Sequence, residues 1–441
     1  MTEKPNIVII VFDTLRADYF QKFLDNNPDL IEQLSDFNNF ENAYSPSPWT
    51  LPSHFSLFTG LYPSEHGVHE EQNSEMEQIF SKALDYTGNF LTKLASSNGY
   101  RTFGISANPM ISNLTGFENK FNEFYNVNIG NISGLENTKN HNSGNKIIRF
   151  VKTSLISDFR GYPANKGYMI ISSIFNKIDF STPFFIFINS MEMHDPYFKS
   201  IFHIHENNKI LRDVFDIKPL SKNRLIQLQK IYDNQLKKIE YIILNVINTL
   251  KLKNKFDNTV IIITSDHGQA LKEHGYYGHG TFLFDELIHI PILIKFPKTF
   301  KQRFDSKTHI NLVDIYDILY QFITNNYNKY NPFYREETFS ESFGLQYSKS
   351  IFQRLINTPA ESNLYIKMNV PRKAIIKNGY KITLNANSDL EECSSFIESQ
   401  KHPLKISLIK ELLSDLEIFN IDKNFRIDEN LILDKMEIRN E

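Results

Sequence analysis

Four residues carry the strongest chemical signal in this sequence: Asp13, Thr50, Asp266 and His267. Asp13 follows one apolar run and Asp266 with His267 follows another, while Thr50 precedes a helical pattern. Taken singly, such residues are usually caps or turn residues. Together, carboxylate oxygens, a hydroxyl and an imidazole suit a hard or borderline divalent cation, and no thiolate points to a softer metal. A metal at Thr50 would lower the pKa of its hydroxyl and polarise a phosphoryl or sulfuryl oxygen, so we expect a metal-assisted nucleophile.

The segment from residue 45 to 67 predicts a loop that delivers Thr50 to the start of a helix. Pro52 suits the first helical position and Gly60 the position just past the end. Thr50 would then lie beside free backbone N–H groups and the positive end of a helix dipole, which stabilise an alkoxide or an anionic ester. The simpler alternative is that Thr50 only caps the helix.

Three apolar runs, residues 6–12, 184–189 and 259–264, predict buried strands of a parallel sheet. Each ends in polar residues: Asp13, His194, and Asp266 with His267. The carboxyl ends of parallel strands meet at one edge of an open sheet, where ligands bind. We therefore expect these residues to share one site.

Other patterns fill in the architecture. Residues 223–252 predict one long helix with a single apolar stripe. Residues 126–145 predict a polar surface insertion, for which a solvated loop is favoured over a lid on the site. Beyond residue 298 the pattern changes to a helix at 310–323, a hairpin at 374–384 around Asn378-Gly379, and a helix at 403–419.

Composition narrows the function class. The 441-residue chain has room for a large α/β domain with an appendage, and its formal charge of -3 gives no sign of a nucleic-acid-binding surface. Cys393 is the only cysteine, which excludes an intrachain disulfide and fits a reducing compartment. The first apolar run is too short for a signal peptide and no segment is long enough for a membrane span, so we expect a cytoplasmic protein, with peripheral membrane attachment open.

The segment SLFTGLYPSEHG, residues 56–67, resembles the one that follows the nucleophile in sulfatases and their relatives in the alkaline phosphatase superfamily. NIVIIVFDTLRADYF near the N-terminus, GYRT at 99–102, MHDPY at 193–197 and the stretch 263–294 are similar as well. The resemblance implies an α/β/α sandwich with a mostly parallel central sheet over residues 1–300. It also implies a smaller C-terminal α+β subdomain over residues 301–441, with antiparallel strands and a helix.

Carried over by position, the resemblance makes Asp13, Asp266 and His267 metal ligands and Thr50 the metal-bound nucleophile. It implies one divalent ion, which could be Ca, Mn, Mg or Zn. His194 and His279 match positions that contact the ester oxygens or the leaving group in relatives. A second metal, as in two-metal phosphatases, would need ligands such as Asp195, His203 and His279. These residues do not have the recognisable spacing of a second metal site, so we expect a single ion.

The sequence departs from the sulfatase pattern at several positions. Thr50 stands where sulfatases carry the Cys or Ser that is oxidised to formylglycine. His54 stands where they carry an arginine, so the resemblance implies a place for His54 among the catalytic residues. Thr14 replaces a second aspartate, and Asn108 and His279 occupy the segments where the family has lysines. The scaffold therefore matches, whereas the maturation signal does not.

Three functions remain open on these residues. The leading one is hydrolysis or transfer of phosphate esters, such as phosphodiesters or phosphonates, through a phospho-Thr50 intermediate. The second is hydrolysis of sulfuric esters on a glycan or small molecule. Thr50 disfavours it without excluding it, because a formylglycine hydrate can expel sulfate by collapse, whereas a threonine sulfate would have to be attacked at sulfur by water. The third, a binding protein without catalysis, is disfavoured by the intact set of four residues.

Overall fold

The protein is known from a computed structural model that describes most of the chain. The described residues are 4–71, 74–127, 166–195, 221–301, 304–327, 335–345, 367–387, 389–395, 406–419 and a few positions from 425 to 432. The predicted insertion at 126–145 lies almost wholly outside this part, as does His203.

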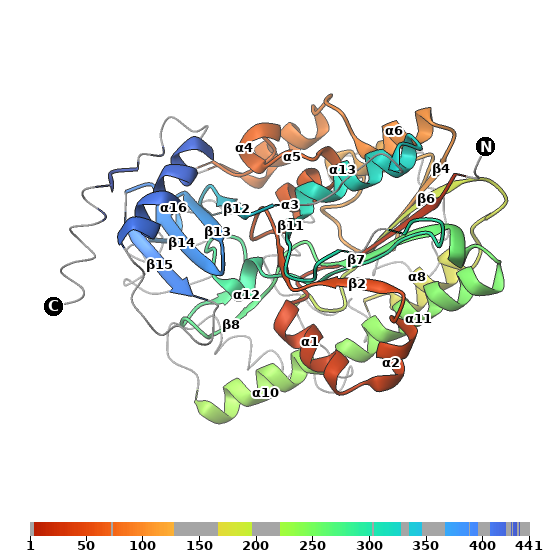
Figure 1. Cartoon of the computed structure of the whole chain (residues 1–441), viewed down its shortest axis with the longest axis horizontal. Coiled ribbons are helices and arrows are strands. Elements are labelled where there is room, and N and C mark those ends of the chain that lie inside the picture. Colours follow the sequence, from red (N-terminus) through yellow and green to blue (C-terminus); the bar gives the residue numbers. More distant parts are fainter. Residues whose placement is uncertain are drawn as a thin grey trace.

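A seven-stranded sheet forms the middle layer, in the order β2-β10-β7-β1-β6-β4-β5 (Figure 1). From β7 to β5 neighbouring strands are parallel, while β10 runs antiparallel to both β7 and β2. The central strands are buried on both faces, which explains their continuous apolar sequences. The strands are β1 Asn6–Phe12, β2 Phe37–Phe40, β4 Arg101–Ser106, β5 Glu123–Asn126, β6 Phe184–Ser190, β7 Thr259–Thr264 and β10 Ile292–Lys295.

Helices cover both faces of this sheet, and the alternation of side chains along β1 shows the two layers. Ile7 and Ile9 lie in a core with residues of α3, α5, α6 and α13, and Val8 lies in a core with residues of α1, α2, α8, α10 and α11. The first layer is α3 Thr50–Thr59, α5 Met76–Leu84, α6 Leu91–Ser97 and α13 Leu312–Ile323; the second is α1 Ala17–Asp25, α2 Pro28–Gln33, α8 Tyr168–Phe175, α10 Lys222–Asp233 and α11 Leu236–Leu252. The predicted α/β/α sandwich is confirmed.

The single helix predicted at 223–252 is wrong in one respect, because the structure divides it into α10 and α11. Asn234 and Gln235 between them have ψ values of -17° and -22°, which belong to a tighter turn than an α-helix. The buried Gln235 side chain donates to the carbonyl of Ile231 across this turn. The predicted stripe nevertheless remains buried from Leu228 to Leu250.

The C-terminal part is an antiparallel sheet of four strands covered by a helix. Asn378 and Gly379 both have positive φ, 51° and 79°, as a two-residue hairpin turn with right-handed strand twist requires, so the predicted hairpin is confirmed. The elements are β12 Glu337–Ser342, β13 Arg372–Lys377, β14 Tyr380–Asn385, β15 Leu390–Ser395 and α16 Ile406–Phe419.

The domain boundary at residue 300 stays a prediction. The structure shows that α13, which follows it, packs in the same core as α3. Just before α13, β11 His309–Asn311 pairs in parallel with β3 Asn42–Tyr44, close to the start of the Thr50 loop. Within the described residues no helix is long and apolar enough to cross a membrane.

Candidate active site

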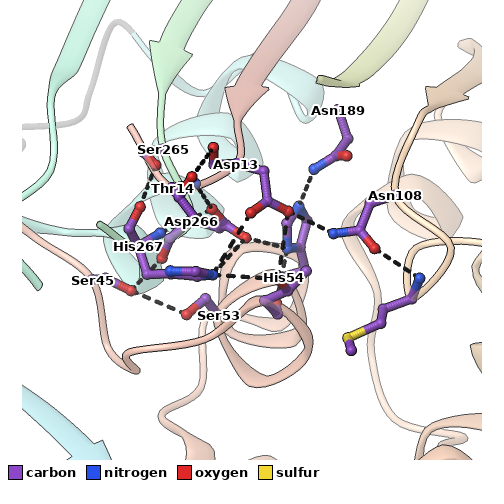
Figure 2. A network of polar contacts seen from close by, with 12 residues as sticks. Asp13, Thr14, Ser45, Ser53, His54, Asn108, Asn189, Ser265, Asp266 and His267 are labelled. Atoms are coloured by element: carbon purple, nitrogen blue, oxygen red, sulfur yellow. Dashed lines mark hydrogen bonds and ion pairs between the residues drawn. The ribbon is translucent and has the colours of Figure 1, made fainter. Parts of the chain in front are cut away.

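The predicted site residues meet at the carboxyl ends of β1, β6 and β7, above the first turn of α3 (Figure 2). Asp13 follows β1, Asp266 and His267 follow β7, and Thr50 opens α3. Residues more than 200 positions apart in the sequence thus face one another, because parallel strands deliver their ends to one edge.

Asp13, Asp266 and His267 form a buried group that could hold a metal ion, with one ligand atom from each lying within 4.8 Å of the others. His267 Nε2 lies 3.8 Å from Asp13 Oδ1 and 3.5 Å from Asp266 Oδ2. Neither of these carboxylate oxygens has a hydrogen-bond partner, although both are buried. Two buried carboxylates with unsatisfied oxygens are costly unless a cation balances them, so these residues fit a divalent ion.

The remaining atoms of these ligands are held by the backbone. Asp266 Oδ1 accepts hydrogen bonds from the N–H groups of Thr14 at 3.2 Å and His267 at 2.9 Å. His267 Nδ1 donates to the Gly268 carbonyl at 2.9 Å, which leaves Nε2 as the nitrogen that faces the carboxylates. Thr14 has a φ of 62°, a costly conformation for a β-branched residue, and that conformation aims its N–H at Asp266.

Burial sets the protonation of these groups when no ion balances them. It raises the pKa of Asp13, and it raises the pKa of Asp266 well above its ordinary value with help from the neighbouring charge of Asp13. Burial likewise lowers the pKa of His267 well below its ordinary value, so its imidazole is neutral. A neutral imidazole is the form that binds metal ions.

Thr50 lies against this group. Its Oγ1 is 3.4 Å from Asp13 Oδ2, to which it donates, and 3.3 Å from His267 Nε2. Thr50 is itself the first residue of α3 and Trp49 is the N-cap, so the expectation that Pro52 takes the first helical position is wrong by two residues. The end of the helix is as predicted, since Gly60 caps it with a φ of 72°, and a Cβ there would collide with Tyr316 at 2.9 Å.

His54 lies beneath Thr50 and is fully buried. Its Nδ1 donates to the Thr50 carbonyl at 2.8 Å, and its Nε2 accepts from the Asn189 amide at 3.1 Å. Burial lowers the pKa of His54 to about 4, so it is neutral and does not supply the positive charge of an arginine. These contacts let His54 fix the first turn of α3, and its expected catalytic role stays a prediction.

Serine hydroxyls tie the three loops of the site together. Ser45 Oγ donates to the Asp266 carbonyl at 2.5 Å and lies 3.0 Å from Ser53 Oγ in α3. Ser265 Oγ accepts from the Leu15 N–H at 2.9 Å. The loops after β1 and β7 are therefore locked to each other and to the Thr50 helix (Figure 2).

His194 and His279 reach the same edge. The His279 ring centre lies 4.6 Å from that of His267 and 5.0 Å from that of His194. His194, Asp195 and His279 form a second group with ligand atoms within 4.8 Å of one another, and it includes two of the three ligands considered for a second metal. His203, the third, lies outside the described residues.

The environments of the two histidines differ. His194 Nδ1 lies 3.0 Å from Asp195 Oδ1, and although burial works in the opposite direction, this carboxylate raises the pKa of His194. His279 Nδ1 donates to Gln269 Oε1 at 2.7 Å, and burial lowers the pKa of His279 to about 3. The site therefore holds one imidazole that favours the charged form and one that is neutral.

Two further residues lie at the site without having been predicted as site residues, Asn108 and Lys166. Asn108, which occupies a lysine segment of the family pattern, donates from Nδ2 to Asp13 Oδ2 at 2.5 Å. Lys166, immediately before α8, is 4% exposed and interacts electrostatically with Asp195, Glu192 and Asp13. Burial lowers the pKa of Lys166 to about 8. A lone lysine ahead of an apolar helix gives no local signal of this placement, since the acidic partners come from other elements.

Comparison with known proteins agrees with this geometry. The family model described as Sulfatase matches residues 5–324, more than half of the chain. An arylsulfatase of Clostridium perfringens is 23% identical over 370 residues, 72% of this chain and 73% of the relative. The extracellular sulfatase SULF-1 homolog of Drosophila melanogaster is 26% identical over 321 residues, which are 67% of this chain but only 28% of the fly protein.

Among solved structures, the phosphonate monoester hydrolase from Silicibacter pomeroyi superposes with a TM-score of 0.64 at 14% sequence identity, covering 96% of each chain. This likeness supports the fold, including the smaller C-terminal sheet. The family match over residues 5–324 covers the buried group of Asp13, Asp266 and His267. The chain belongs to the Sulfatase family, a family of ester hydrolases in the alkaline phosphatase superfamily.

Proposed function

We propose that this protein hydrolyses phosphate esters, either phosphodiesters or phosphonate monoesters, through a covalent intermediate on Thr50. The observation that carries the proposal is the position of Thr50 Oγ1, at the start of α3 and within 3.4 Å of Asp13 and 3.3 Å of His267. Asp13, Asp266 and His267 would hold one divalent ion. When bound, that ion would lower the pKa of the Thr50 hydroxyl and withdraw charge from the ester oxygens.

In the first step the Thr50 oxygen, having lost its proton to solvent, attacks phosphorus, and the bond from phosphorus to the leaving oxygen breaks. His194 gives the departing oxygen its proton, because the Asp195 carboxylate favours the charged imidazole before the step. In the second step water attacks phosphorus, the Thr50–phosphorus bond breaks, and one water proton returns to His194. Thr50 regains its hydroxyl proton from solvent.

The positive charges near the metal group suit an anionic ester. Lys166 and the His194 imidazolium each interact electrostatically with Asp13 and with Asp195. His279, neutral and in ring contact with His267, can contact an equatorial oxygen without adding charge. Phosphoryl transfer relies mainly on such positioning and charge stabilisation.

Sulfate ester hydrolysis is the second candidate, and the sulfatase names of the matching relatives favour it. A threonine sulfate ester cannot eliminate sulfate as a hydrated aldehyde can, so water would have to attack sulfur to release it. The phosphate proposal therefore follows from Thr50 rather than from the relatives. Transfer to an acceptor alcohol in place of water is a variant of the same two steps.

The test compares matched aryl substrates: a phosphodiester, a phosphonate monoester and a sulfate, with purified full-length protein and divalent metal added. We expect kcat/KM for one of the phosphorus esters to exceed that for the sulfate at least tenfold, about 1.4 kcal/mol of transition-state stabilisation. Mass spectrometry of slowed reactions should find the phosphorus adduct on Thr50. A tenfold preference for the sulfate would establish the second candidate, and no turnover of any ester would support a binding protein.

A further inference from the structure

The C-terminal sheet holds the loop that leads to the nucleophile. Ser340 Oγ, in β12, donates to the Ser45 carbonyl at 2.6 Å. The neighbouring Glu341 N–H donates to the Pro46 carbonyl at 2.8 Å. The chain from Ser45 to Thr50 is therefore bonded on one side to a subdomain whose described residues contribute no ligand to the metal group.

A buried carboxylate makes a further link, at the residue directly before Thr50. Trp49 is 1% exposed, and its Nε1–H donates to Glu70 Oε2 at 2.7 Å. The other oxygen, Glu70 Oε1, accepts from the N–H of Phe343, which follows β12, at 2.8 Å. Glu70 itself is fully buried. One carboxylate thus bridges the indole beside the nucleophile and the backbone of the C-terminal subdomain.

The two hydrogen bonds at this position match a carboxylate better than a neutral acid, whereas burial favours the neutral form. Both neighbours are N–H donors, and each bonds a separate oxygen. Protonation turns one of the two oxygens into a donor and weakens it as an acceptor, so one N–H loses its bond in a buried site. The ionisation of Glu70 therefore decides whether both Trp49 and Phe343 are held.

The charged and titratable groups around Glu70 are mostly paired. Lys82 of α5 pairs with Glu71, and Lys373 of β13 pairs with Glu341. His69 donates to the Glu70 carbonyl at 2.6 Å and stacks on Phe343, with ring centres 3.7 Å apart.

Burial shifts the pKa of Glu70 and the pKa values of the neighbouring histidines in opposite directions. It raises the pKa of Glu70 to about 7. It lowers the pKa of His69, and it lowers the pKa of His66, in the preceding helix α4 Pro63–His66, to about 3. Burial thus moves the pKa of Glu70 up to neutral pH and moves the pKa values of both histidines down.

We propose that Glu70 is a positioning residue that couples the C-terminal subdomain to the nucleophile, holding Trp49, and through it Thr50, only while its carboxylate is ionised and bonded to Phe343. The consequence for turnover rests on the proposed role of Thr50. The coupling of Glu70 to Trp49 does not, because it can be observed without substrate.

Trp49 is the single tryptophan of the chain, so tryptophan fluorescence of the protein reports on the surroundings of this one residue. We expect the emission of the wild type to change in one transition with a midpoint near pH 7, where the indole gains or loses its carboxylate partner. Glu70→Gln should abolish the transition. Glu71→Gln, which removes the adjacent carboxylate paired with Lys82, should leave it in place. A transition of wild-type size in Glu70→Gln, or none in the wild type, would overturn the proposal.

Kinetics then test positioning against mere stability. Glu70→Gln and Trp49→Phe should each lower kcat by about ten- to a hundredfold with little change in KM, as expected for a displaced nucleophile. The double variant should be no slower than the slower single variant, because both changes break one link. A loss of kcat in the double variant equal to the product of the two single losses would contradict the proposal.

Two further variants keep the outcomes distinguishable. Circular dichroism checks folding. If Glu70→Gln does not fold, Glu70→Asp takes its place, because it keeps an ionisable group and should shift the midpoint of the fluorescence transition. An unchanged midpoint would count against the proposal. Thr50→Ala should keep the wild-type transition whether or not Thr50 is the nucleophile. Loss of the proposed function and loss of the proposed coupling are therefore separate results.

Discussion

The Asn108 amide donates to Asp13 at 2.5 Å, the shortest hydrogen bond that any described side chain makes to a carboxylate of the metal group. It fixes one oxygen of the ligand without adding charge, while the other oxygen stays free of hydrogen bonds. This is the usual function of a group that orients a metal ligand from outside the coordination sphere.

Replacing Asn108 with Ala should therefore weaken divalent metal binding by about ten- to a hundredfold, since such orienting partners typically contribute that much. Calorimetric titration of metal-free protein measures it. Asn119→Ala, at an exposed position, is the control. Equal affinities in the two variants would remove Asn108 from the site.

Removal of the metal ligands makes a stronger prediction. Asp13→Ala together with Asp266→Ala should leave the protein without bound divalent metal, because His267 alone cannot balance its charge. Elemental analysis after dialysis measures the content, and chelation of the wild type should abolish turnover reversibly. Asp195→Asn should retain one ion. Full occupancy in the double variant would place the ion elsewhere.

The Thr50 hydroxyl should be indispensable. Thr50→Ala should lose nearly all turnover with its fold intact, and Thr50→Ser should keep part of it because the hydroxyl remains. Thr50→Cys should not create a sulfatase, since His54 stands at the arginine position and is neutral. Steady-state kinetics with far-ultraviolet circular dichroism decide this, and a folded Thr50→Ala protein with near-wild-type rates would refute the assignment.

Lys166 should make substrate binding pH-dependent. Burial lowers its pKa to about 8, so it carries charge below that pH and loses it above. KM for an anionic ester should therefore rise as the pH passes 8 in the wild type. In Lys166→Met the KM should be high at every pH. Lys166→Arg should keep KM low on the alkaline side, because arginine stays charged. A Lys166→Arg profile identical to that of the wild type would disprove this role.

Glu70 should also affect stability. Its folded pKa is raised from 4.5 to about 7, so its contribution to stability is fully present below pH 4.5 and is lost as the pH rises through 7. The difference of about 2.5 pKa units corresponds to roughly 3 kcal/mol. Urea unfolding should show that Glu70→Gln loses less stability than the wild type over this range, with Glu71→Gln as control. Parallel curves for Glu70→Gln and the wild type would exclude this linkage.

The sequence by itself determined the elements whose signal is local. Continuous apolar runs identified β1, β6 and β7, and Asn378-Gly379 identified the hairpin, because strand burial and positive φ leave direct marks on residue choice. Asp13, Asp266 and His267 followed from the strands, since parallel strands bring their carboxyl ends to one edge.

Tertiary structure alone decided how side chains from distant elements pair. Asn108 contacts Asp13, and Glu70 bridges Trp49 and Phe343, across sequence separations of 21 to 273 residues. Lys166 likewise meets its acidic partners from other elements. The tight turn that divides α10 from α11 is likewise absent from the apolar stripe, which continues across it. The physical reason is that the state of a buried polar group is set by what it faces after folding, and local sequence does not encode those neighbours.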